Sequence, residues 1–91
     1  MDVSASVARI AGVLSWYLRL NPLASDTLEG IAQWWLSRDA FTLADLAGAL
    51  RQMERAGVIE ATHAADGQVR YRRTAPDARS DAQLDRFIAG S

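Results

Sequence analysis

The sequence predicts an α+β domain that is mainly helical, with three helices, a β-hairpin and a short additional C-terminal helix. Apolar residues recur at three- and four-residue steps over the first half of the chain, which is typical of helices. Alternating apolar residues then flank a glycine turn, which is typical of a hairpin. The 91 residues suffice for one modest core. We therefore expect a single domain over 1–91, with its core segment at 3–75.

The composition excludes several kinds of site. The chain has no cysteine, which excludes disulfides, thiolate metal sites and a cysteine nucleophile. His63 is the only histidine, so a metal site with several histidines is excluded. It also lacks a nucleophile and an orienting acid at the spacing that a catalytic base needs. The formal net charge of −1 argues against a strong overall attraction to nucleic acid or anionic membranes. We expect a cytoplasmic protein with no catalysis, no cofactor, no metal and no membrane contact.

The first helix is expected from residue 3 to residue 20. Val7, Ile10 and Leu14 lie on one stripe at about 100° per residue. Pro22 ends the helix, because the residue before a proline is pushed away from helical angles. A second apolar stripe, turned to one side of the first, consists of Val13, Trp16 and Leu20.

The second helix is expected to begin at Asp26. This residue fits a capping box with Glu29, whose side chain would reach back to the backbone amide of the cap. The helix is expected to end near Leu36, with Trp34 at the edge of its apolar face. A short polar turn at 37–40 follows.

The third helix has clear start and stop signals. Thr42 is the expected N-cap, and Asp45 is well placed near the positive end of the helix. Gly57 ends the helix because glycine accepts the left-handed angles of a C-cap, and Val58 supplies the accompanying apolar contact. The expected buried stripe is Leu43, Leu46, Leu50 and Met53.

Two registers are open to the hairpin. A two-residue turn at 66–67 pairs Ala61 with Arg72 and divides the apolar residues between two faces. A three-residue loop at 65–67 instead pairs Ala61 with Tyr71 and places all the apolar residues of the hairpin on one face. A shift of the register by one residue would lose this arrangement. Gly67 suits the left-handed position of that loop. We predict strands at about 58–64 and 68–74, paired as His63–Val69, Ala61–Tyr71 and Glu60–Arg72.

The final helix is expected at about 80–89, where Leu84, Phe87 and Ile88 recur at helical spacing. This face has two possible partners. It can cover the second stripe of the first helix within one chain, or the same stripe in a second copy. We favour coverage within the chain.

Several residues together resemble the third helix and wing of the winged-helix superfamily. They are Leu46, Leu50 and Met53, then Ala56-Gly57-Val58-Ile59, and finally Gly67 and Tyr71. The resemblance covers about 26–74 and implies a short first strand near residues 23–24. Similar modules bind DNA, RNA or only proteins, so the fold does not determine the function.

The third helix does not look suited to reading DNA. In DNA-binding members its N-terminal half reads base edges, which favours Arg, Lys, Asn and Gln. The outward positions expected here are Phe41, Ala44, Asp45 and Gly48. A DNA-binding transcriptional regulator is therefore the alternative function, with the nucleic-acid candidates Arg51, Gln52, Arg55, Arg70, Arg72 and Arg73. Glu60 is expected to neutralise Arg72 across the strands.

The preferred function is a protein–protein interaction or adaptor module that uses the outer face of the third helix and the wing. Ala44 and Gly48 are small residues one turn apart, with Arg51 and Arg55 at their rim, and these four are the expected partner-binding residues. Tryptophans in a small domain are usually core, so we expect this of Trp16 and Trp34. The alternative is a homodimer instead of a monomer, with Trp16, Trp34, Leu84 and Phe87 as the self-association candidates. A second alternative is a structural subunit whose tryptophans are buried in a larger assembly.

Overall fold

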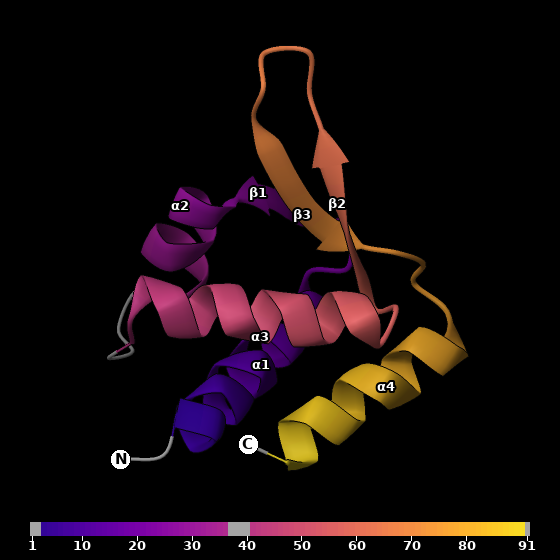
Figure 1. Ribbon diagram of the computed structural model, residues 1–91. Helices are drawn as coiled ribbons and strands as arrows, with labels where there is room; N and C mark the ends of the chain where they lie inside the picture. Colours follow the sequence, from indigo (N-terminus) through magenta and orange to yellow (C-terminus); the bar gives the residue numbers. More distant parts are fainter. Residues whose placement is uncertain (1–2, 37–40, 91) are drawn as a thin grey trace.

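A computed structural model describes residues 3–36 and 41–90 of the chain. The fold is α+β, with a three-stranded antiparallel sheet in the order β1-β3-β2 and helices packed below it (Figure 1). The polar turn expected at 37–40 lies outside the described residues. The elements are α1 (Val3–Leu20), β1 (Ser25–Thr27), α2 (Leu28–Gly30), η1 (Ile31–Trp35), α3 (Leu43–Arg55), β2 (Ile59–His63), β3 (Val69–Arg73) and α4 (Ala78–Ala89).

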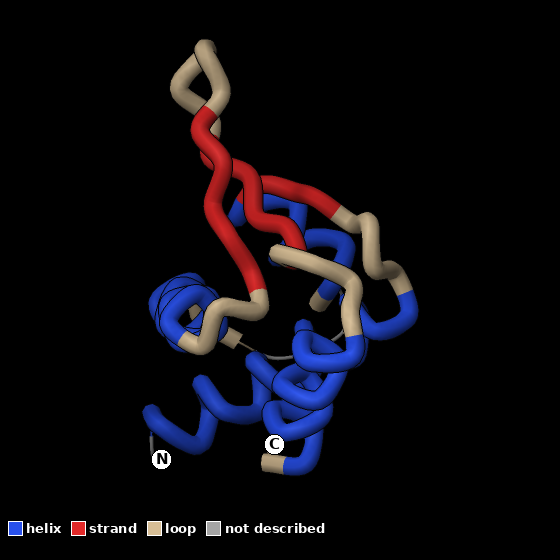
Figure 2. Tube along the Cα trace, turned by 90° about the vertical axis from the view of Figure 1, so that its right-hand side faces the viewer, coloured by secondary structure: helices blue, strands red, loops and turns tan. Residues whose placement is uncertain are grey.

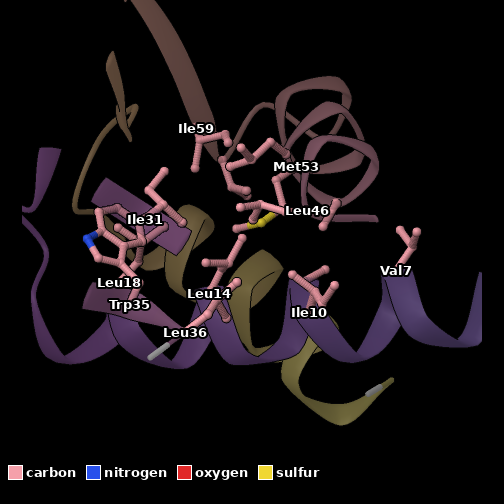
Figure 3. Packing of buried hydrophobic residues seen from close by; sticks show 14 of the residues in the cluster. Val7, Ile10, Leu14, Leu18, Ile31, Trp35, Leu36, Leu46, Met53 and Ile59 are labelled. Atoms are coloured by element: carbon pink, nitrogen blue, oxygen red, sulfur yellow. The ribbon is translucent and has the colours of Figure 1, made fainter. Parts of the chain in front are cut away.

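The hydrophobic core lies where α1, α3 and the base of the hairpin meet. Figure 3 shows the side chains of Leu14, Leu46 and Met53 converging at its centre, and all three are fully buried. Tyr17 of α1 stacks on Trp35 of η1, with ring centroids 4.6 Å apart and planes 15° from parallel. This stacked pair attaches the π-helical segment η1 to α1.

The segment after α1 differs from the expectation in three details. The helix expected from Asp26 to near Leu36 is a short α2 followed by the π-helical η1. The short first strand is β1, at Ser25–Thr27 rather than at residues 23–24. The cap of the second helix is Thr27, whose Oγ1 accepts a hydrogen bond from the Gly30 amide at 3.2 Å, so the prediction of Asp26 was wrong. Asp26 is instead a strand residue opposite Tyr71, and its carboxylate accepts from the Thr27 amide at 2.8 Å.

Both ends of α3 are as predicted. Thr42 caps the helix by accepting from the Asp45 amide at 3.1 Å. At the other end Gly57 has φ +79°, and its amide donates to the Glu54 carbonyl at 3.0 Å. The Val58 amide donates to the Met53 carbonyl at 3.1 Å, and this pair of bonds is a Schellman motif.

The predicted hairpin register is confirmed. Ala61 lies opposite Tyr71, Glu60 opposite Arg72 and His63 opposite Val69. Gly67 has φ +86°, and its amide donates to the Ala64 carbonyl at 3.0 Å, which closes the three-residue loop. The hairpin projects well beyond the helices, as the side view also shows (Figure 2).

The final helix, α4, begins at Ala78, two residues before the expected start, because Asp77 caps it by accepting from the Ser80 amide at 2.8 Å. Leu84 is fully buried and belongs to the core cluster. Within the described ranges, no helix is long and apolar enough to span a membrane.

Candidate interaction surface

The outer face of α3 has apolar side chains at its start and arginines at its end. Ala44, Arg51 and Arg55 are exposed, as expected. Leu43 is 58% exposed, so the prediction that it is buried was wrong. The buried side of α3 begins one turn later, at Leu46, because the first turn extends past the edge of the core.

Gly48 does not lie on the open surface expected for it. A Cβ added at Gly48 would lie 3.3 Å from Cγ2 of Val7, so this glycine faces α1 and lets the two helices approach closely. The Arg51 guanidinium is also nearby, with Nη2 3.8 Å from the same position. The expected partner-binding set therefore keeps Ala44, Arg51 and Arg55 on the surface, while Gly48 becomes a packing residue.

The arginines of the hairpin fall into three different environments. Arg70 is exposed. Arg72 Nε donates to Glu60 Oε1 at 2.7 Å, which is the cross-strand pair predicted from the register. Arg73 is only 6% exposed. Arg73 is therefore not accessible for the phosphate contact considered for it, and Arg72 is already paired.

The buried Arg73 joins β3 to α4. Its guanidinium donates to Ser80 Oγ at 2.8 Å, to the Asp77 carbonyl at 3.4 Å and to the Asp81 carboxylate. Sequence reasoning missed this cluster. Asp81 and Asp85, one turn apart on α4, were the available signal, because like charges at this spacing repel and a basic partner would offset the repulsion.

Arg19 of α1 completes the same cluster. Its Nη1 lies 2.8 Å from Asp81 Oδ1, and its Nε lies 3.1 Å from Asp85 Oδ1. The hydrogen bond from Arg73 holds the pKa of the Asp81 carboxyl below its usual range; burial opposes this, and the charge of Arg19 adds to the lowering. The cluster thus fixes α4 against both α1 and β3.

Two of the three tryptophans are on the surface. Trp35 is 8% exposed, whereas Trp16 is 58% and Trp34 is 67% exposed, so the core interpretation of Trp16 and Trp34 was wrong. Leu20 is 64% exposed. The expectation that α4 covers the second stripe of α1 was therefore wrong for Trp16 and Leu20.

The position of α4 explains this exposure. Gly12 and Ser15 of α1 are buried, and Arg19, one turn further along, binds Asp81 of α4. Small side chains let α4 approach this side of α1, next to the second stripe rather than over it. Leu84 is buried by that packing and is excluded as a self-association residue, while Phe87 is half-buried.

The residues that the structure describes include no group of three or more His, Cys, Asp and Glu side chains that could hold a metal ion. His63 is exposed at the end of β2. The features that stand out are instead surfaces: the outer face of α3, the arginines, and the exposed tryptophans.

Comparison with known proteins identifies no relative of this chain. No protein-family model, curated protein or solved structure matches the chain. The surfaces described above are therefore the basis for inferring a function.

Proposed function

We propose that this chain is a non-catalytic winged-helix module that binds a partner protein through the outer face of α3. The order of helices and strands and the glycine-closed hairpin support the winged-helix assignment. The observation that carries the function is the exposure of Leu43 and Ala44 at the start of α3. Most base readout uses hydrogen-bonding side chains at these positions, and these two side chains form no hydrogen bonds.

An apolar start and a basic end suit a protein interface. Protein interfaces combine an apolar centre with arginines, which are enriched at contact sites. Arg51 and Arg55 supply that charge, and Trp34 is exposed on η1, which lies at the same end of the molecule as the start of α3 (Figure 1). A complementary partner would bury Leu43 and pair the arginines with carboxylates.

Photo-crosslinking in the native host tests this proposal. A photoreactive amino acid at Ala44 is expected to give a discrete protein adduct. The matched control is Ala65, an exposed alanine in the loop of the projecting hairpin, outside α3 and α4. Adducts to nucleic acid at position 44, or equal adducts at both positions, would contradict the proposed use of α3.

DNA binding is the second candidate, favoured by the exposure of Arg51, Gln52 and Arg55 on α3 and Arg70 on the hairpin. Its signature is an affinity that falls steeply with salt, because each phosphate contact releases counterions. Titration of duplex DNA at low and moderate salt distinguishes the two functions. We expect no binding at tens of micromolar protein in low salt, given the net charge of −1.

A further inference from the structure

The two flanks of α4 carry opposite charges. Asp81 and Asp85 face α1, where Arg19 binds both of them. Arg79 and Arg86 lie on the other flank, seven residues or about 10 Å apart along the helix axis. Both arginines are exposed, and neither has an ion pair in the part of the chain that the structure describes. The acidic flank is therefore used within the fold, and the basic flank is open.

The basic flank borders a groove between the C-terminal end of α3 and α4. Two adjoining hollows of about 220 and 260 Å³ share Ala56 and Gln83. We call this the α3–α4 groove. Its principal lining residues are Ala56, Gly57, Arg79, Gln83, Arg86 and Phe87.

The groove has an arginine toward each end and an apolar part between α3 and α4. Arg79 lines one hollow and Arg86 the other, while Ala56 and Phe87 contribute apolar surface. Among the described residues that line the groove, only Asp77 is acidic, and its carboxylate caps α4 by accepting from the Ser80 amide. The two arginines outnumber this single carboxylate, so the lining keeps a net positive charge.

We infer that the α3–α4 groove binds an acidic segment of the partner protein, with carboxylates on Arg79 and Arg86 and an apolar side chain against Phe87. Arginine pairs with carboxylates through two parallel hydrogen bonds, which gives such contacts both strength and direction. A phosphate backbone has no side chain that would use the apolar surface, so the lining favours a peptide over nucleic acid. This inference depends on the proposed protein-binding function and extends its surface from α3 to α4.

Peptide selection on the full chain tests the inference. Short random peptides displayed on phage are selected on the wild type alone, and each selected peptide is then tested on the Arg79→Gln/Arg86→Gln variant. The selected peptides are expected to combine acidic residues with a large apolar residue. Their synthetic forms should bind the double variant at least about tenfold more weakly, as expected for the loss of charge-assisted hydrogen bonds. The control Arg70→Gln changes an exposed arginine on the hairpin and should bind as the wild type does.

A second measurement does not depend on the folding of the variants. Replacing the acidic residues of a selected peptide by Gln and Asn should abolish its binding to the wild-type chain. Selected peptides without acidic residues, unchanged affinity for the double variant, or displacement of the peptide by duplex DNA would each overturn the inference. Crosslinking at Ala44 tests the outer face of α3, whereas the peptide experiments test the α3–α4 groove. An error in the groove inference and an error in the α3 proposal would therefore give different results.

Discussion

The guanidinium of Arg73, the last residue of β3, donates a hydrogen bond to the carboxylate of Asp81 in the first turns of α4. Asp81 also binds Arg19 of α1, so one carboxylate connects the sheet, the first helix and the last helix. The position of α4 determines which side of α1 stays exposed and where the α3–α4 groove lies. This ionic cluster therefore helps to determine where the α3–α4 groove and the exposed side of α1 lie.

Replacing Arg73 with alanine is expected to destabilise the fold by about 2–3 kcal/mol, because it removes three hydrogen bonds of a buried charged group. Urea unfolding measures this change. Arg70→Ala, on the exposed face of the same strand, is the control and should stay within about 0.5 kcal/mol of the wild type. Equal effects of the two substitutions would show that the buried cluster contributes little.

Acid should weaken the attachment of α4. The pKa of Asp81 is lowered in the folded state, chiefly by the hydrogen bond from Arg73. Its stabilising contribution is therefore complete above the unfolded-state pKa of about 3.9 and is lost as the pH falls through the lower folded-state value. Urea midpoints between neutral pH and about pH 3 should fall more steeply for the wild type than for Asp81→Asn. Parallel curves would contradict the assignment.

Gly57→Ala should cost about 1–2 kcal/mol, since the residue has φ +79° and alanine is strained there. No heavy atom outside its immediate neighbours lies within 4 Å of an added Cβ, so the cost comes from the backbone and not from a clash. Thermal unfolding checks this value. A substitution to asparagine, which tolerates left-handed angles better, should recover part of the loss.

The two adjacent tryptophans provide a matched pair. Trp35→Ala removes a buried ring stacked on Tyr17 and is expected to cost about 3–5 kcal/mol. Trp34→Ala removes an exposed ring and should change the free energy of unfolding by less than about 0.5 kcal/mol. A large loss of stability in Trp34→Ala would mean that this ring packs against the fold.

Self-association through α1 stays a prediction, with Trp16 and Leu20 as the residues that a second copy would bury. Sedimentation at tens of micromolar should then show a larger mass for the wild type than for Trp16→Ala/Leu20→Ala. Both side chains are exposed, so the double variant should fold normally. A wild-type chain that sediments as a monomer would reject this interface.

Much of the local structure follows from the sequence. Thr42 and Gly57 define the two ends of α3, because caps depend on side chains and angles within a few residues. The register of the hairpin follows from Gly67 and from the need to place Ala61 and Tyr71 on one face. These features are set by interactions between residues that are close in the chain or joined by a short loop.

The tertiary structure decided which surfaces are free. Helical spacing identifies an apolar stripe but does not say which neighbour covers it, so the exposure of Leu43 and Trp16 followed only from the packing of α3 and α4. The burial of Arg73 likewise depends on Asp81 and Arg19, which are distant in sequence and meet only when α4 packs on α1. Contacts between distant segments depend on the whole arrangement of helices, and the accessible surface, where this protein would bind its partner, is the result of that arrangement.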